Sequence, residues 1–338
     1  MELSLYHRGR LRHSVPSIAD RFGLRSRTQL GADLAEMISS GLRGERFQSD
    51  LSSIGHLRPG LSLPAYAGLV PDDGLAPIMN LFDRVGGGKD FTQRVTKRTS
   101  RDFRGGRLTY DEHDGTDFVC PVGTPLCAAA PGTVVLIRDR WLRGGLTVCV
   151  DHGSGVVTQY THCARALLPI GAKVARGEPV ALSGTSGVDL AAFFPWVPPH
   201  VHFMSWVRGV PVDPFVATGE DRLAGTWLHR DGPQPSAAST DSTSTLSEVD
   251  LGAAQAIADA CTDATVRAQA QQVRDEPASL AALLDDAVHH DRFGWPEEVS
   301  PSTYRPLAPG AASVRLTLPL PDAEYRGARF ADKKRTAP

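Results

Sequence analysis

The sequence lacks any apolar run long enough to cross a membrane, and it also lacks a strong net charge. A membrane-spanning helix needs about 20 consecutive apolar residues, and no stretch of the 338 residues approaches that length. The formal net charge is −2 and the isoelectric point is near 6.6. Such a balance gives no general attraction to nucleic acid or to an anionic membrane surface. We therefore expect a globular protein with no nucleic-acid partner and no transmembrane segment.

Paired cysteines and an export signal are missing as well. The five cysteines are an odd number, and no CxxC pair occurs among them. In a chain of this length they are expected to be reduced, mostly buried thiols rather than a disulfide framework. The opening stretch "MELSLYHRGRLRHSV" is basic, but no apolar segment follows it. These observations predict a cytoplasmic protein by default, and action in the periplasm or cell wall would require non-classical delivery.

Composition divides the chain into four segments. Residues 1–75 form a polar N-terminal extension that is partly helical, because apolar residues recur at helical spacing over 28–42. Residues 76–218 contain short apolar or alternating runs separated by Gly- and Pro-rich turns, a rhythm typical of an antiparallel all-β unit. Strands this short need a second sheet or closure to enclose a core. Residues 219–247 are a Ser/Thr/Pro-rich linker, and residues 248–338 are a helical C-terminal region with an irregular basic tail.

Four histidines and one aspartate of the β unit stand in a pattern that suits a metal site. Alternate residues of a strand face the same way, so His113 and Asp117 are expected to share a face, with Gly115 leaving room between them for an ion. His200 and His202 obey the same rule on another strand. Two imidazoles and one carboxylate are a common ligand set of catalytic zinc. His113, Asp117 and either His200 or His202 would complete it, and the other residue of the pair would lie beside the metal.

The third element of this pattern is "VTQYTHC", which contains His162. We expect His162 and the non-ligand member of the 200/202 pair to move protons or to donate hydrogen bonds to a developing oxyanion. HExxH is absent from the sequence, so the helix-borne glutamate base of the usual zincins is not available.

The motifs, taken in order, resemble those of the lysostaphin-type (LytM-like) zinc metalloendopeptidases. They are "HDGTD", "GTPLCAAAPGTV", "YTH", "GAKVARGEPVALSGTSG" and "HVHF", and they cover about residues 105 to 215. The resemblance implies a mainly β catalytic domain of two packed antiparallel sheets, of the duplicated-hybrid-motif type, with helical or irregular extensions at both ends. It also implies that His113, Asp117 and His202 hold one zinc ion, while His162 and His200 are catalytic.

The implied reaction is hydrolysis of peptide bonds by metal-activated water, with peptidoglycan stem or crosslink peptides as substrate. One alternative is a zinc-binding regulatory scaffold without activity, and another is an intracellular peptidase with a different substrate. A phosphoryl carrier with paired histidines is disfavoured, because the carboxylate of Asp117 would repel a phosphohistidine. The bond cleaved and the oligomeric state are not predicted.

Three features fall outside the shared motifs. Phe193, Phe194 and Trp196 make the segment before "HVHF" strongly apolar, either as a wall of a substrate cleft or as a surface that packs against the extensions. Residues 84–107 are rich in Lys and Arg, which we interpret as a solvated charged face. His289 and His290 stand at a helix end, where we expect a favourable interaction with the helix dipole rather than a metal site.

Overall fold

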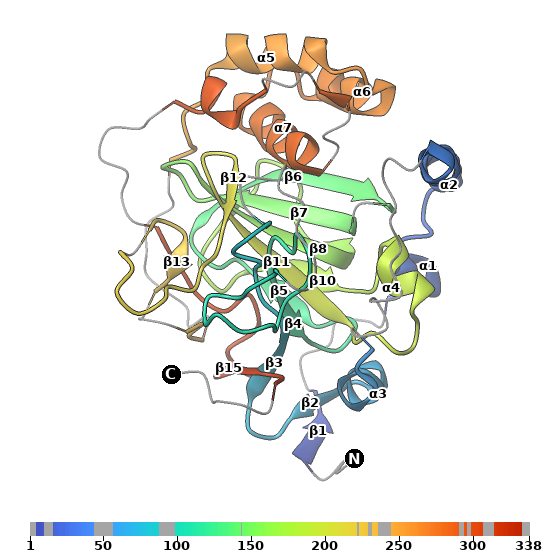
Figure 1. Cartoon of the computed structure of the whole chain (residues 1–338), viewed down its shortest axis with the longest axis vertical. Coiled ribbons are helices and arrows are strands. Elements are labelled where there is room, and N and C mark those ends of the chain that lie inside the picture. Colours follow the sequence, from blue (N-terminus) through green and yellow to red (C-terminus); the bar gives the residue numbers. More distant parts are fainter. Residues whose placement is uncertain are drawn as a thin grey trace.

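The structure is a computed structural model of the whole chain. It describes residues 5–9, 16–43, 57–87, 99–142, 144–221, 223–228, 232–235, 245–290, 294–295, 299–306 and 314–332. Within these ranges the strands gather at the centre of the molecule and the helices lie around them (Figure 1).

The central strands form one large hydrogen-bonded sheet. Its main path has the order β15-β3-β4-β11-β8-β7-β6-β9, while β10 pairs with both β5 and β8, and β12 pairs with β11. All of these pairs are antiparallel except β15 with β3. The strands are β3 (Leu75–Asn80), β4 (Thr116–Val119), β5 (Pro125–Cys127), β6 (Gly132–Arg140), β7 (Gly145–Asp151), β8 (Val156–Ala166), β9 (Lys173–Val174), β10 (Pro179–Ser183), β11 (His200–Val207), β12 (Val210–Val212) and β15 (Gly327–Phe330).

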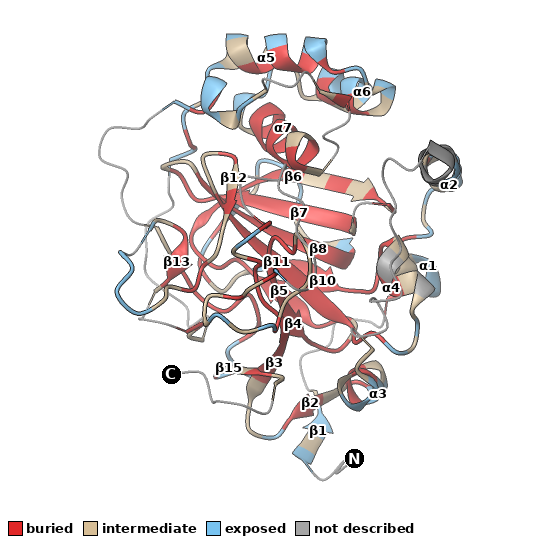
Figure 2. Cartoon of the chain, viewed as in Figure 1, coloured by how far each residue is buried: buried red, intermediate tan, exposed pale blue. Residues whose placement is uncertain are grey.

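Strand β11 shows how the sequence pattern builds two cores. Its residues alternate between the faces of the sheet. Val201 and Phe203 enter a core with Phe118, Tyr160 and other residues of the strands. Met204 and Trp206, on the opposite face, enter a second core beneath the C-terminal helices. Because both faces are covered, the central strands are almost wholly buried (Figure 2).

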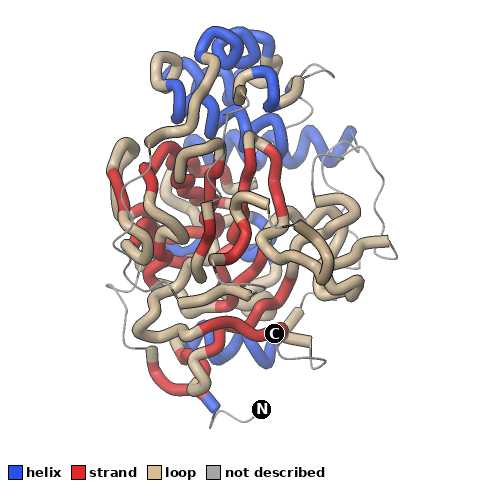
Figure 3. The backbone as a smooth tube through the Cα atoms, turned by 90° about the vertical axis from the view of Figure 1, so that its left-hand side faces the viewer, coloured by secondary structure: helices blue, strands red, loops and turns tan. Residues whose placement is uncertain are grey.

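Three helices of the C-terminal region cover one face of the sheet. They are α5 (Leu251–Ala260), α6 (Ala264–Gln272) and α7 (Pro277–His290). Leu280 and Leu284 of α7 are fully buried against the second core. Figure 3 shows these helices as a layer at the top of the molecule, above the strands. Helix α7 begins at Pro277, and the Ala-rich stretch before it forms two helices because Asp263 caps the second of them.

The N-terminal segment lies along another side of the molecule. It contains β1 (Tyr6–Arg8), α1 (Ile18–Phe22), α2 (Arg27–Arg43), α3 (Pro59–Ala67) and β2 (Leu69–Pro71). The helix expected over 28–42 is confirmed as α2. A short helix, α4 (Val188–Ala192), precedes the apolar segment before β11.

Three short strands extend the β structure beyond the predicted β unit. β13 (Thr226–Trp227) pairs in parallel with β14 (Arg315–Leu316), and Trp227 is fully buried among Phe118, Phe203 and Phe215. β15 lies beside β3 at the edge of the large sheet. The prediction of a mainly β domain with helical extensions at both ends is therefore confirmed. The five cysteines, all within the described residues, are buried free thiols, as expected.

A buried histidine of this β framework predicts sensitivity of the fold to acid. His152 is 2% exposed, its Nδ1–H donates to the Pro131 carbonyl at 2.9 Å, and its Nε2 pairs with the Thr158 hydroxyl at 2.8 Å. Burial lowers the pKa of His152 to about 4, so the ring is neutral when folded. Between the unfolded pKa near 6.5 and this value only the unfolded chain binds the proton, so stability falls as the pH falls through that window.

We therefore expect the free energy of unfolding to fall by about 3 kcal/mol between pH 6.5 and pH 4 because of His152, at roughly 1.4 kcal/mol per pKa unit. Denaturant titrations at several pH values measure this. His152→Asn, whose amide can still donate toward Pro131 but does not titrate, should show a flatter pH profile. If the free energy of unfolding depends on pH in the same way in both proteins, His152 is not the source of the acid sensitivity.

Candidate metal centre

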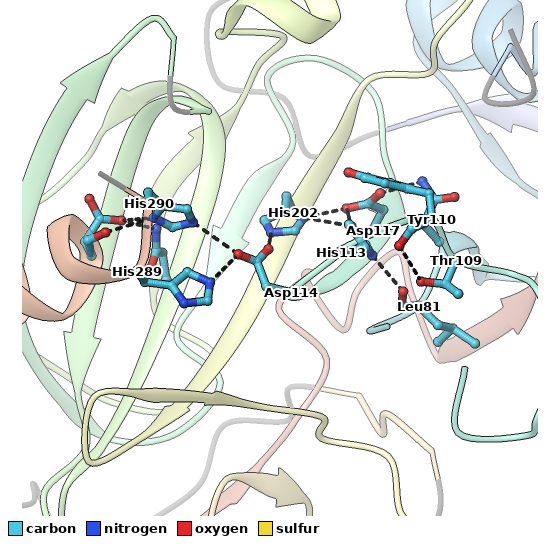
Figure 4. A network of polar contacts seen from close by, with 12 residues as sticks. Leu81, Thr109, Tyr110, His113, Asp114, Asp117, His202, His289 and His290 are labelled. Atoms are coloured by element: carbon cyan, nitrogen blue, oxygen red, sulfur yellow. Dashed lines mark hydrogen bonds and ion pairs between the residues drawn. The ribbon is translucent and has the colours of Figure 1, made fainter. Parts of the chain in front are cut away.

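Three side chains predicted as metal ligands meet at one point beside β4 and β11. Asp117 on β4 lies directly opposite His202 on β11, and Asp117 Oδ1 is 2.8 Å from His202 Nδ1. His113 Nε2 lies 3.2 Å from Asp117 Oδ1 and 3.1 Å from His202 Nδ1 (Figure 4). All three residues are buried. One atom of each therefore faces a common position at a spacing that suits a metal ion.

The alternation argument placed His113 on a strand, and this prediction is wrong. β4 begins at Thr116, and His113 belongs to the loop before it. Asp83 holds this loop, because its backbone N–H donates to the His113 carbonyl at 2.6 Å and its carboxylate accepts the backbone N–H of Glu112 at 3.1 Å. The loop brings the imidazole to Asp117 without the help of strand alternation.

Gly115 has a different role from the one expected. A Cβ atom at this position would lie 2.7 Å from the Phe203 carbonyl oxygen and 2.9 Å from His202 Nε2. These distances are shorter than real Cβ contacts allow. The glycine therefore makes room for the ring of His202 rather than for an ion.

Each of the three side chains is oriented by a further contact behind it. His113 Nδ1–H donates to the Leu81 carbonyl at 2.7 Å, and Asn80 Nδ2 donates to Asp117 Oδ2 at 2.7 Å. His202 Nε2 lies 3.0 Å from Asp114 Oδ1. These contacts assign the proton of His113 to Nδ1 and that of His202 to Nε2. Nε2 of His113 and Nδ1 of His202 each keep a lone pair for a metal. The sequence motifs contain no signal for Asn80 or Leu81.

The charges at the centre favour an ionised carboxylate. Burial alone would raise the pKa of Asp117, but the neighbouring imidazoles of His113, His200 and His202 outweigh it and hold the pKa well below its usual range. Burial also opposes a charge on His202, yet the contacts with Asp114 and Asp117 raise its pKa to about 9.

His162 and His200 lie next to the three residues, as predicted. The ring of His162 is 4.9 Å from that of His200 and 6.1 Å from that of His202, centroid to centroid. His200 Nε2 lies 3.7 Å from Asp117 Oδ1. His162 Nδ1–H donates to the Ser186 carbonyl and His200 Nδ1–H to the Pro198 carbonyl, both at 2.8 Å. Both rings therefore point Nε2 away from their backbone partners.

Burial keeps both of these imidazoles neutral. It lowers the pKa of His200, and burial together with the neighbouring His200 and His202 lowers the pKa of His162 to about 3. The backbone of His162 has φ of 62°, in the left-handed region that residues with a Cβ seldom occupy. Such strain is common at functional sites, where the surrounding structure holds it in place. Here the backbone N–H of His162 donates a hydrogen bond to the Gly144 carbonyl at 3.0 Å, which helps to hold this backbone conformation.

The three converging side chains fit zinc by their chemistry. They offer two imidazole nitrogens and one carboxylate oxygen, a set that leaves a fourth position of a tetrahedron open. The outer partner of each ligand restricts its rotation. A mononuclear metal site is thus compatible with the donor atoms and with their surroundings.

The apolar segment before β11 packs against the N-terminal extension. The Phe194 ring makes edge contacts with Phe22 at 5.3 Å and with Tyr66 at 5.0 Å, centroid to centroid. The backbone N–H of Arg58 donates to the Trp196 carbonyl at 2.9 Å. Phe194 and Trp196 are each 49% exposed. Packing thus accounts for part of this apolar surface, and both residues remain partly exposed. Residues 88–98 of the basic segment 84–107 lie outside the described residues.

Sequence reasoning missed Asp114 and the histidine pair of α7. Asp114 Oδ2 lies 2.7 Å from His289 Nε2 and 3.2 Å from His290 Nε2, so Asp114 joins α7 to His202 (Figure 4). His290 Nδ1 does lie 3.1 Å from the Asp286 carbonyl, as a helix-end interaction requires. The other side of the pair faces Asp114, which the sequence spacing of 175 positions could not reveal.

Comparison with known proteins places this geometry in context. The family model described as "Peptidase family M23" matches residues 111–214. The peptidoglycan DD-endopeptidase ShyA of Vibrio cholerae is 38% identical over 101 residues, which are 30% of this chain and 22% of ShyA. The DD-carboxypeptidase/endopeptidase Mpg of Neisseria meningitidis is 32% identical over 106 residues, 31% of this chain and 23% of Mpg. The chain thus spans less than a quarter of either relative.

Among solved structures, the catalytic domain of lysostaphin from Staphylococcus simulans is 26% identical. The match covers 30% of this chain and 75% of that chain, with a TM-score of 0.27. The family match over residues 111–214 includes all five of the residues predicted for the site, which are His113, Asp117, His162, His200 and His202. The resemblance noted in the sequence is confirmed, and this part of the chain is a peptidase family M23 domain.

Proposed function

We propose that the protein is a zinc-dependent endopeptidase that hydrolyses peptide bonds of peptidoglycan. One observation carries the proposal: the ligand atoms of His113, Asp117 and His202 converge beside two neutral imidazoles, those of His162 and His200. The M23 family match and the peptidoglycan DD-endopeptidase relatives support the reaction class and the substrate class.

The side chains divide the chemistry between them. When bound, zinc supplies Lewis-acid chemistry, which polarises a carbonyl oxygen and lowers the pKa of water. His113, Asp117 and His202 hold the ion, and their single negative charge leaves it net positive. His162 and His200 are neutral and each has its Nδ1–H engaged, so each Nε2 can accept a proton. One ring takes the proton from water at Nε2 and gives it to the leaving nitrogen of the cleaved peptide bond, and the other, when it has taken up a proton from solvent, donates to the oxyanion.

The substrate class also bears on where the protein acts. Peptidoglycan lies outside the cytoplasmic membrane, so we propose that the reaction takes place there. The expectation of a cytoplasmic protein receives no support from the relatives, three of which have peptidoglycan in their names. Among the described helices, none is both long and apolar enough to cross a bilayer.

Removal of the metal tests the proposal directly. Purified peptidoglycan is incubated with the full chain, and the released peptides are identified by mass spectrometry. We expect cleavage by the zinc-loaded protein and a loss of roughly a thousandfold or more after chelation, because the metal contributes several kcal/mol to the transition state. Readdition of zinc to the chelated protein should restore cleavage.

The masses of the products also identify the bond that is cut. Boiled protein and zinc alone serve as controls for spontaneous release. If the zinc-loaded chain releases no peptide from peptidoglycan, the proposed substrate is wrong. If it then cleaves other peptides, the intracellular-peptidase alternative holds, and if it cleaves nothing while binding zinc, the scaffold alternative holds.

A further inference from the structure

Asp114 occupies an unusual position between the metal centre and the C-terminal helices. Its carboxylate is 12% exposed, and it receives contacts from three imidazoles. His202 lies against Oδ1, whereas His289 and His290 lie against Oδ2 (Figure 4). A buried carboxylate is costly unless it is paired and hydrogen-bonded. The histidines of α7 therefore stabilise Asp114 at the place where it meets His202.

The chain of contacts continues through α7 into the sheet. His290 Nδ1 lies 3.0 Å from Asp286 Oδ1, and Gln159 of β8 donates to the same oxygen at 2.9 Å. Arg138 of β6 makes a close ion pair with the other oxygen of Asp286. Two strands of the sheet thus hold the carboxylate that orients His290.

Packing explains why α7 reaches the metal centre. His200, His202, Met204 and Trp206 alternate along β11 and share the face that α7 covers. The indole of Trp206 makes an edge contact with the His289 ring at 5.0 Å. The same burial that attaches the helix to the sheet therefore delivers its last turn to Asp114.

Resting on the proposed function, we propose that His289 and His290 are positioning residues of the metal centre: they hold Asp114, and Asp114 orients the ligand His202. The hydrogen bond to Asp114 keeps the proton of His202 on Nε2 and the lone pair of Nδ1 toward the metal. A carboxylate behind a metal-bound imidazole also raises its basicity and fixes its ring. Under this proposal the C-terminal helices contribute residues that orient a metal ligand.

The same cluster has a competing interpretation as a second metal site. One ligand atom from each of Asp114, His289 and His290 lies within 4.8 Å of the others. The contacts favour hydrogen bonds instead. His290 lies between two carboxylates, those of Asp114 and Asp286. Burial lowers the pKa of His290, but these carboxylates outweigh it and raise the pKa to about 10. Both ring nitrogens of His290 thus face carboxylates as hydrogen-bond donors, Nε2 toward Asp114 and Nδ1 toward Asp286, so we expect one metal ion per chain.

Zinc affinity and the geometry of the bound metal test the proposal without any peptidase assay. The probes are zinc, titrated against a chromophoric chelator, and cobalt(II), whose visible spectrum reports ligand geometry. We expect Asp114→Ala, and the double variant His289→Ala with His290→Ala, to weaken zinc binding by about 10- to 100-fold and to change the cobalt spectrum. Asp114→Asn, which keeps an acceptor oxygen but loses the charge, should fall between Asp114→Ala and the wild type.

A matched variant on the same helix separates positioning from folding. Leu284→Ala removes a fully buried apolar side chain of α7 that belongs to the second core. It should lower the melting temperature while zinc affinity and the cobalt spectrum stay as in the wild type. Circular dichroism checks that all variants are folded.

Two outcomes would overturn the proposal. One is wild-type zinc affinity with an unchanged cobalt spectrum in the Asp114 and α7 variants. The other is two metal ions per wild-type chain, reduced to one in the double histidine variant, which would make the cluster a metal site. If instead the variants lose zinc affinity but the wild type cleaves no peptidoglycan, the proposed function fails and the positioning role stands.

Discussion

Replacing His202 by alanine is expected to abolish both metal binding and hydrolysis. Nδ1 of His202 is one of the three proposed ligand atoms, and the remaining pair, from His113 and Asp117, is too few for a tight zinc site. The loss of a contribution of several kcal/mol corresponds to a fall in kcat/KM of roughly a thousandfold or more. Elemental analysis should find about one zinc per wild-type chain and almost none in the variant.

His7→Ala is the matched control, since it removes an imidazole that is exposed and pairs with Asp72 far along the chain from the site. Its zinc content and activity should equal those of the wild type. A second ligand variant, Asp117→Asn, should behave like His202→Ala, because an amide replaces the only carboxylate among the three ligands. Full zinc content in His202→Ala would show that the ligand set is wrong.

Replacing His162 should separate catalysis from metal binding. His162 lies beside the ligands, with its Nδ1–H on the Ser186 carbonyl and its Nε2 available for proton transfer. General acid–base groups contribute about 10²- to 10⁴-fold, so we expect a loss of that size in kcat with zinc content unchanged. Asparagine is the replacement of choice, because it tolerates the positive φ of this position better than alanine does.

Ser154→Asn offers a control for that backbone, since Ser154 also has a positive φ of 54° but lies in a turn between β7 and β8. It should retain both zinc and activity. His200→Asn should again retain zinc and lose activity, and the pH profiles of the two histidine variants should assign base and oxyanion donor. Cleavage at the wild-type rate by zinc-loaded His162→Asn would remove this residue from the mechanism.

The candidate site was predictable largely because its signals are local. HDGTD and HVHF each place two relevant side chains within a few residues, and the ligand chemistry of histidine and aspartate is the same wherever they lie. Strand alternation correctly placed His200 and His202 on one face of β11. The same argument was wrong for His113, because a loop held by Asp83, outside every motif, delivers that side chain.

The β character was likewise predictable from short apolar runs between turns, whereas the contribution of distant segments was not. β15 joins β3 at the edge of the sheet, and Trp227 fills a core formed by β4 and β11. These pairings depend on which apolar surfaces remain uncovered after the central strands have assembled. Neither segment carries that information in its own composition.

The sequence by itself determined the residue types of the metal centre, their order and the chemistry open to them, because those depend on side chains and short-range spacing. Only the tertiary structure decided what holds each ligand. Leu81 and Asn80 reach His113 and Asp117 across a strand pair, and Asp114 reaches His289 across 175 positions. Burial of the apolar face of α7 on β11 creates that last contact. Such long-range packing is a property of the folded core, and no local motif encodes it.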